Sequence, residues 1–453
     1  MLPEDKPFAV LIALCLSMLG LPAQAAEMVP QSPEVEATTA ARPLKMGLDD
    51  VIERVKAQNL QVLIRKESVL RALEQSYQRR AALLPQFSAR AEQARQQLAR
   101  GFGAEDFESP PFNRFGARVE GSLAVFDTQR YADYRIARLN YAIEQLDFEV
   151  AMQDILEQAV MLYFTQLRDL RSVEIAEGNL ARERALLDLA RQQFEAGAAI
   201  KIDVTRADVR VATERRALME AEIAVENSIL ELKALLDIDL DQPVELDRSI
   251  IQGINAPPSI KRYGSLEVLT ELRPELRGQQ KTLEQAELAK QAVGWQRLPT
   301  VELFADWGYD TNRVFDGEEG EAWLLGLRAR IPIWEGGRIA AEKREAGAAV
   351  RQNEYRMRDL RNTVERQFKF SLLEMDSRYA QIDIARDEVR LGFDEVEQAR
   401  ERYREGLGDN RELIDAQNSL AEAERSELRA IYLYGLSRLA FARSIGSVER
   451  VLD

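Results

Sequence analysis

The stretch from Glu321 to Arg338 changes its hydrophobic period partway along, and this change constrains the fold more than any other feature. Up to Ile333 the apolar residues occupy alternate positions, as in a strand with one apolar face. Beyond Arg338 they recur every three or four positions, as in a helix. A weaker copy of the same change lies at 117–130. The sequence therefore predicts that a strand leads directly into a long helix at two places.

The two junctions belong to an internal duplication. Leu84-Pro85 in the first half matches Leu298-Pro299 in the second, and Phe194-Glu195-Ala196-Gly197 matches Tyr403-Arg404-Glu405-Gly406. Each half has the pattern of a helix, two strands and a helical hairpin, so one unit occurs twice. We expect a mostly α fold with a small β part, in which the long helices are coiled-coil-like.

The amino terminus resembles an export signal. Its apolar run, 9–21, is short for a membrane helix, and Ala23-Gln24-Ala25 fits a small-residue cleavage site; a retained anchor is the alternative. The expected organisation is a signal peptide (1–25), a flexible amino-terminal segment (26–46), a first repeat unit (47–237), a connector (238–264), a second repeat unit (265–447) and a carboxyl-terminal tail (448–453).

Four segments alternate in the manner of strands, and they form two pairs: 87–92 with 115–125, and 301–309 with 323–333. A strand of about ten residues can cross a bilayer, and Trp307, Tyr309 and Trp323 cluster near one end, where an aromatic girdle would lie. The alternative is a half-buried sheet in a soluble protein. Four strands cannot close a membrane barrel, so the membrane interpretation requires oligomers, and twelve strands from three copies would leave a lumen.

Composition excludes several chemistries. The chain has no histidine, and its one cysteine, Cys15, lies within the expected signal peptide. Catalysis by a Ser-His-Asp triad or a thiol, and metal sites made of His and Cys, are therefore excluded, and we expect no cofactor. The net charge of −15 argues against a nucleic-acid partner. No glycine-rich phosphate loop is present.

Three features together make the chain resemble the TolC-type outer-membrane efflux and secretion channel family. They are the duplicated unit, the junction Ile331–Arg338, and Tyr403-x-x-Gly406 followed by Glu412–Gln417. The resemblance implies a homotrimer with a twelve-stranded barrel in the outer membrane and a helical barrel in the periplasm. It also implies docking to a periplasmic adaptor and to an inner-membrane transporter that supplies the energy, so we expect a passive duct, with small-molecule efflux favoured over protein secretion.

The resemblance also assigns candidate site residues at the second helical hairpin. Glu412 and Asp415 match acidic residues that ring the closed periplasmic entrance of the family, where three copies would bring six carboxylates together and bind divalent cations. The alternative is an ordinary helix start, because Asp409, Asn410 and Glu412 also suit a helix amino terminus as cap and first-turn residues. A gate function and an ordinary helix start therefore remain as alternatives for this segment.

A second assignment is a latch between the two hairpins. Tyr403 matches the tyrosine of the family's gate and Asp203 matches its carboxylate partner, which implies a hydrogen bond that holds the entrance closed. The alternative is that Tyr403 is the last residue of the helical seam and Asp203 a helix cap. The arginine of the family's latch falls on Gly408, which departs from the pattern.

The turns of the two hairpins contain Gly197, Gly406 and Gly408, and the resemblance makes these turns the expected adaptor contacts. At the strand-to-helix junction, Gly336 and Gly337 precede Arg338, and we interpret the glycine pair as a backbone device for a tight turn. Pro332 is tolerated only at the end of a strand, which puts the membrane boundary near Ile331.

Two other classes of protein remain open on residues alone. A periplasmic adaptor also has coiled-coil hairpins, but it would need a lipoyl-like β domain and no duplicated strand pairs. A carboxylate enzyme, such as a glycosidase, would need a cleft-forming globular domain, which the helical pattern does not predict.

Overall fold

The computed structural model describes residues 43–97, 99–100, 107–108, 111–197, 199–249, 273–311, 321–405, 407 and 410–450. These residues all belong to one compact unit, Pro43–Asp453. The expected signal peptide, most of the flexible amino-terminal segment, and two of the predicted tip residues, Gly406 and Gly408, lie outside the described residues.

Two long helices are the main elements of the unit, one from each repeat. Helix α4 spans Thr128–Glu195 and α9 spans Arg338–Arg404, and each has a length of about 100 Å at 1.5 Å per residue. Shorter helices complete the two repeats: α2 (Leu48–Gln58), α3 (Leu60–Ala81), α5 (Lys201–Leu235), α8 (Pro274–Trp295), α10 (Asn410–Ser444) and the 3₁₀ turn η1 (Val448–Arg450).

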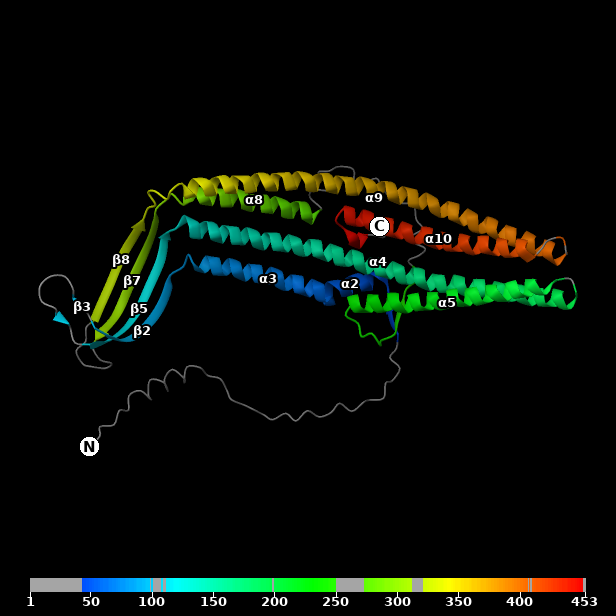
Figure 1. Cartoon of the computed structure of the whole chain (residues 1–453). Helices are drawn as coiled ribbons and strands as arrows, with labels where there is room; N and C mark the ends of the chain where they lie inside the picture. Colours follow the sequence, from blue (N-terminus) through cyan, green and yellow to red (C-terminus); the bar gives the residue numbers. More distant parts are fainter. Residues whose placement is uncertain are drawn as a thin grey trace, which may run out of the picture. The chain divides into compact units, whose positions relative to one another are not determined.

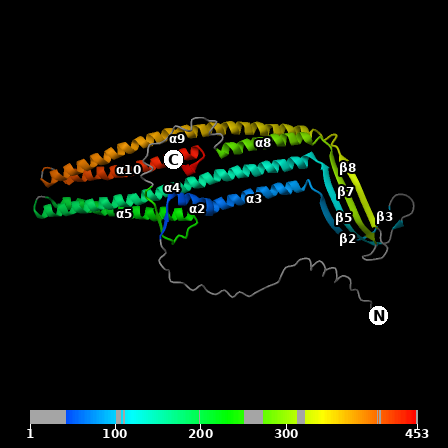
Figure 2. The same cartoon turned by 180° about the vertical axis from the view of Figure 1, so that it is seen from behind.

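The shorter helices divide α4 and α9 into two halves. In the half near the sheet, α4 packs against α3 and α8, and α9 packs against α8. In the half near the hairpin turns, which we call the tip-side half, α4 packs against α5 and α10, and α9 packs against α10. Figures 1 and 2 show this arrangement from opposite sides. In the half near the sheet the helices therefore lie in the order α3, α4, α8, α9. In the tip-side half the order is α5, α4, α10, α9.

The shorter helices of the two halves meet end to end at two equivalent places: α5 meets α3, and α10 meets α8. Asn59 donates from Nδ2 to the carbonyl of Leu235 at the end of α5 (2.7 Å), and its Oδ1 accepts from the backbone N–H of Val62 at the start of α3 (3.0 Å). Arg273, just before α8, donates from Nη1 to the carbonyls of Arg443 and Ser444 at the end of α10 (both 3.0 Å). Each side chain satisfies helix-end groups that would otherwise be unpaired.

The second joint is ionic. Arg273 also pairs with Glu275 (3.1 Å), which in turn lies 2.7 Å from Arg443, and Arg443 reaches Asp154 of α4 at 2.6 Å. Burial raises the pKa of Glu275, but the two arginines outweigh it and hold that pKa below its ordinary value. Three helices, α4, α8 and α10, thus meet around one charged cluster.

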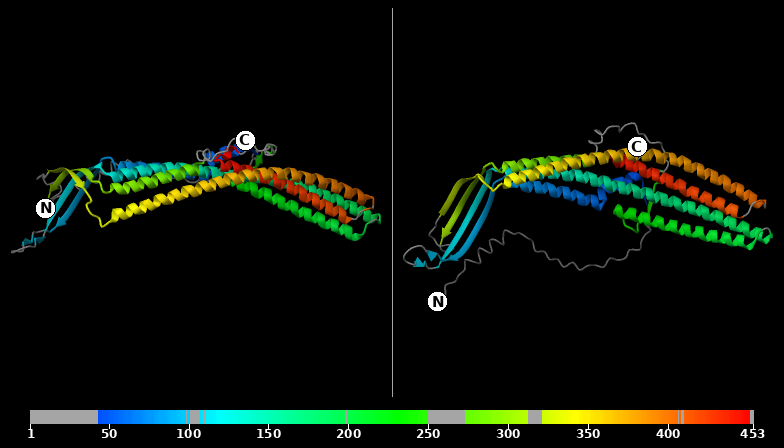
Figure 3. Two further views of the ribbon diagram at one scale, coloured as in Figure 1. Left: turned by 90° about the horizontal axis from the view of Figure 1, so that it is seen from above. Right: turned by 45° about the horizontal axis from the view of Figure 1, so that its top comes forward.

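The four expected strands form one antiparallel sheet in the order β2-β5-β7-β8. Their bounds are Gln86–Gln96, Phe112–Phe126, Thr300–Thr311 and Glu321–Arg330. The sheet continues from the ends of α4 and α9, as Figure 3 shows from two directions. Strand β8 ends three residues before the alternation does, because Pro332 has no N–H to continue the ladder.

A second, parallel sheet joins β1 (Leu44–Met46) to β6 (Val244–Leu246). The sequence did not predict it, because each strand has three residues and lies in a segment that we expected to be flexible or a connector. The hairpin β3–β4 (Ala99–Arg100 with Phe107–Glu108) was also not predicted.

The main hydrophobic core lies where α2, α4, α5, α9 and α10 meet near the parallel sheet. Tyr163 and Tyr434 are fully buried there, and the hydroxyl of Tyr163 donates to the carbonyl of Asp247 at 2.7 Å. None of the helices in the described ranges is both long and apolar enough to cross a membrane.

Replacement of the joint arginine tests its contribution to stability. We expect Arg273→Ala to cost about 3 kcal/mol, because it leaves buried carbonyls and charges without their partner. Arg277→Ala is the control, because its half-exposed ion pair with Glu149 contributes less than about 1 kcal/mol. Calorimetric melting of the detergent-purified protein measures both, and equal shifts in melting temperature would contradict the joint.

Candidate functional site

The sheet has one apolar and one charged face. The paired positions Val119, Trp307 and Trp323 lie on one face, and Trp323 is 73% exposed. The same face carries further apolar side chains: Phe87, Leu123, Leu303, Tyr309, Leu325 and Leu327. An exposed apolar face of this extent is unusual in a water-soluble chain and suits contact with lipid.

The other face carries a network of ion pairs. Arg118 of β5 contacts both Asp306 (2.7 Å) and Asp310 of β7, and Arg114 lies 3.5 Å from Asp310. Gly308 lies opposite Arg118, and a Cβ there would lie 2.2 Å from the carbonyl oxygen of Ala117, so no larger residue fits. Two further pairs continue the network across the sheet: Arg90 with Glu120, and Arg328 with Glu302. The alternation in the sequence does not predict these pairs, because they depend on the register between the strands.

The strand-to-helix junctions of the two repeats are built in corresponding ways. Arg130 donates to the carbonyl of Ala82 at the end of α3 (3.1 Å), and Arg338 donates to Gln296 Oε1 at the end of α8 (3.1 Å). In the second repeat the turn requires Gly336 and Gly337, whose φ angles are +60° and +84°. Both arginines therefore attach the start of a long helix to the end of the preceding one.

The predicted gate carboxylates lie at the start of α10. Glu412 forms an ion pair with Arg402 of α9 (3.1 Å), so it connects the two arms of its own hairpin. Asp415 is exposed one turn further along. Among the described residues of this single chain, no cluster of three or more acidic side chains could hold a metal ion. A ring of carboxylates would need other copies of the chain.

The two predicted latch residues lie near each other without the expected hydrogen bond. Tyr403 is 6% exposed, and its hydroxyl has no hydrogen-bond partner. Burial raises the pKa of Tyr403, and the charge of Asp203 raises it further. Asp203 accepts from the backbone N–H of Ile200 (3.4 Å), as the cap alternative expects. The latch therefore stays a prediction.

The hairpin of the first repeat ends in a left-handed glycine. Gly197 has a φ of +72°, and its N–H donates to the carbonyl of Phe194 (3.1 Å). Gln193, next to this turn, donates to the carbonyl of Tyr403 at 3.3 Å. The ends of α4 and α9 are thus connected directly.

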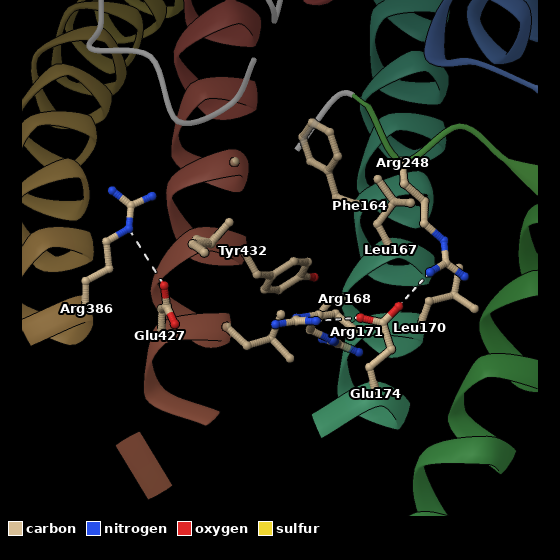
Figure 4. A pocket seen from close by; sticks show the side chains of 13 residues that line it. Phe164, Leu167, Arg168, Leu170, Arg171, Glu174, Arg248, Arg386, Glu427 and Tyr432 are labelled. Atoms are coloured by element: carbon tan, nitrogen blue, oxygen red, sulfur yellow. Dashed lines mark hydrogen bonds and ion pairs between the residues drawn. The ribbon is translucent and has the colours of Figure 1, made fainter. Parts of the chain in front are cut away.

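A cavity of about 420 Å³ lies between α4 and α10, close to the end of β6. Arg168 lies over the ring of Tyr432, with 4.7 Å between its guanidinium carbon and the ring centroid. Figure 4 shows that the other basic side chains of the cavity face acidic ones. The pairs are Arg171 and Arg248 with Glu174, and Arg386 with Glu427. Arg171 and Arg248 share a single carboxylate, so the cavity lining holds four arginines and two glutamates and keeps an excess of positive charge.

The geometry defines a class of protein: a chain whose amphipathic sheet, suited to contact with lipid, continues into long helical hairpins. The family model described as "Outer membrane efflux protein" matches residues 51–237 and 266–447. The chain belongs to this family. It is therefore an outer-membrane protein and not the periplasmic adaptor or carboxylate enzyme that the sequence left open.

Individual relatives are distant. The chain is 24% identical over 271 residues to the "Probable efflux pump outer membrane protein TtgC" of Pseudomonas putida, a match that covers 58% of this chain and 54% of the relative. It is 22% identical over 380 residues to the "Alkaline protease secretion protein AprF" of Pseudomonas aeruginosa, covering 80% of this chain and 77% of that protein. The chain thus spans about half the length of TtgC and about three quarters of AprF.

The fold is similar to that of the solved outer-membrane channel OprN. The TM-score is 0.78 at 18% sequence identity, and the match covers 88% of this chain and 90% of that one.

Replacement of two different glycines by alanine should change the stability of the protein in opposite directions. Gly337→Ala should destabilise the protein by about 1 kcal/mol, because a side chain at a φ of +84° is strained. Gly178→Ala within α4 should stabilise it by about 0.5–1 kcal/mol, because an added Cβ meets only Arg182 at 3.8 Å and helix propensity improves. Melting temperatures measure both, and stabilisation by Gly337→Ala would contradict the junction geometry.

Proposed function

We propose that this protein is a homotrimeric outer-membrane duct through which substrates leave the periplasm without energy input from the duct itself. The observation that carries the proposal is the amphipathic four-stranded sheet with two unpaired edges, continuous with long helices. In lipid, unpaired backbone groups at a sheet edge cost several kcal/mol each, so β2 and β8 need partners from other copies.

Three copies satisfy this requirement best. Twelve strands close around a lumen, whereas eight strands are filled by their own side chains. The face that carries Arg118, Asp306 and Asp310 would line the lumen, and the face that carries Trp307 and Trp323 would meet lipid. Charged pairs in a water-filled channel keep their hydration, which supports this orientation.

The lateral helices support contact between copies outside the membrane. The outermost helices of the unit, α9 on one side and α3 and α5 on the other, carry exposed apolar side chains. Leu373 of α9 is 69% exposed and Ile223 of α5 is 68% exposed. Other exposed apolar side chains on these helices include Leu60, Ile64, Leu70, Val209, Met219, Phe370, Ile384 and Leu391. Two apolar edges on one chain fit a closed ring of copies.

The hairpin tips would form the periplasmic entrance. Three copies of Glu412 and Asp415 would place six carboxylates near one axis and favour cations when the entrance is closed. The charge of Asp203 acts on Tyr403, which supports the proposal that a movement of the hairpins forms the latch hydrogen bond. The turns at Gly197, Gly406 and Gly408 would contact a periplasmic adaptor, which connects the duct to an inner-membrane transporter.

Efflux of small molecules is the favoured cargo, because TtgC is named as an efflux pump component. Secretion of proteins is the second candidate, because the match to AprF, named for alkaline protease secretion, covers more of the chain. Deletion of the gene with complementation separates them: restored resistance to toxic compounds supports efflux, and restored release of a secreted protein supports secretion.

The trimer is tested by a substitution at the lateral edge. Leu373→Glu should lower the trimer fraction of detergent-purified protein at least tenfold, because it puts a charge into the apolar contact between copies. Leu373→Met retains the apolar surface and should leave the trimer intact. Native mass spectrometry counts the copies, and a trimer that tolerates Leu373→Glu would contradict this contact.

The latch is tested by conductance in planar bilayers. Asp203→Ala and Tyr403→Phe should each raise the conductance severalfold if a hydrogen bond between these residues holds the entrance closed. Asp208→Ala is the control, because its ion pair with Arg191 lies within one hairpin. Unchanged conductance in both variants would contradict the latch but would not contradict the proposed duct.

A further inference from the structure

A buried polar cluster lies in the tip-side half, where α4, α5 and α10 meet. Glu183 of α4 is 6% exposed, and its Oε2 has no hydrogen-bond partner. Asn179, one turn earlier on the same helix, is also buried, and its Nδ2 has no partner. Buried polar atoms normally find partners, so two unpaired atoms in adjacent turns call for an explanation.

The surroundings of Glu183 explain why no partner is available. Arg182, the neighbouring cation on α4, is already bonded to Asn179 Oδ1 and to Glu424 of α10. Glu214 of α5, largely buried and paired with Arg425 of α10 at 3.7 Å, is a second acid near Glu183. Arg210 of α5 is the remaining cation that acts on Glu183.

Glu183 also lies where α4 packs on two sides. Leu186 packs with Ala399, Tyr403 and Leu413 of the second hairpin. Leu187 packs instead with Ala207 of α5. Both leucines follow Glu183 by about one helical turn on the same surface of α4. A change of charge at Glu183 therefore acts on the layer that holds the two hairpins together, which includes Tyr403.

We propose that Glu183 is a proton-binding site that couples the packing of α4 against α5 and α10 to the acidity of the periplasm. With a proton, the carboxyl is neutral and its O–H can donate, so the three helices pack without a buried uncompensated charge. Without the proton, the carboxylate of Glu183 is charged and favours contact with water, which weakens the packing of α4 against α5 and α10.

The charges around the site set the direction of the effect. Burial raises the pKa of Glu183 to about 7, against the opposing effect of Arg210 and with a further rise from Glu214. Between about pH 4.5 and 7, Glu183 is therefore protonated in the folded chain and ionised in the unfolded chain. The stability that this proton supplies is complete below about pH 4.5 and is lost as the pH rises through about 7.

Infrared difference spectroscopy of the purified full-length protein tests the site directly. Between pH 5.5 and 8.5 the wild type should lose a protonated-carboxyl band with a midpoint near 7. The band should be absent in Glu183→Gln, which mimics the neutral form, and should persist in Glu177→Gln, an exposed position on the same helix. A band that survives in Glu183→Gln, or is missing in the wild type, overturns the proposal.

The melting temperature tests whether the protonation of Glu183 is coupled to the packing of the helices. The melting temperature of the wild type should fall between pH 5.5 and 8.5 by more than that of Glu183→Gln, and equal falls overturn the coupling. If the protein is the duct proposed above, its conductance in planar bilayers should rise over the same pH range, and Glu183→Gln should flatten that rise. A wild type without conductance would refute the duct, whereas the infrared and melting results test Glu183 independently of it.

Discussion

The rest of the structure depends on the two unpaired edges of a four-stranded sheet. Inside lipid no water is present to satisfy the free N–H and C=O groups of β2 and β8, so the sheet is incomplete as a single chain. The apolar face and the ion-paired face give this sheet a lipid side and a water side. The proposed closure by several copies follows from this constraint, and the proposed lumen follows from the twelve strands that three copies would supply.

Helical continuity is the second requirement, and two side chains provide it. Asn59 and Arg273 occupy equivalent places in the duplication, and each joins the end of a tip-side helix to the start of a sheet-side helix. The first joint uses a neutral amide, whereas the second uses a buried ionic cluster with Glu275 and Arg443. The two joints thus have the same geometry but different chemistry.

Much of the fold could be predicted from the sequence because it depends on local periodicity. The four strands and the long helices follow patterns with periods of two and 3.6, and Pro85, Pro299 and Pro332 mark the ends of elements. The parallel sheet of β1 and β6 could not be predicted, because three-residue strands carry too little pattern. Likewise the Arg118–Asp306 pair depends on strand register, and the burial of Glu183 depends on which face of α4 meets two neighbours at once. The gate and latch residues came from family resemblance, and the single chain tests neither.

The most direct test of the central claim is crosslinking between the edge strands of neighbouring copies. The expected mature chain has no cysteine, since Cys15 lies in the predicted signal peptide, so cysteines introduced in pairs along β2 and β8 report without background. Under oxidation in cells, the account predicts a ladder of covalent dimers and trimers for at least one β2–β8 register, and none for single cysteines. A chain that remains monomeric in every register, or that crosslinks only within itself, would contradict the closure of the sheet by three copies.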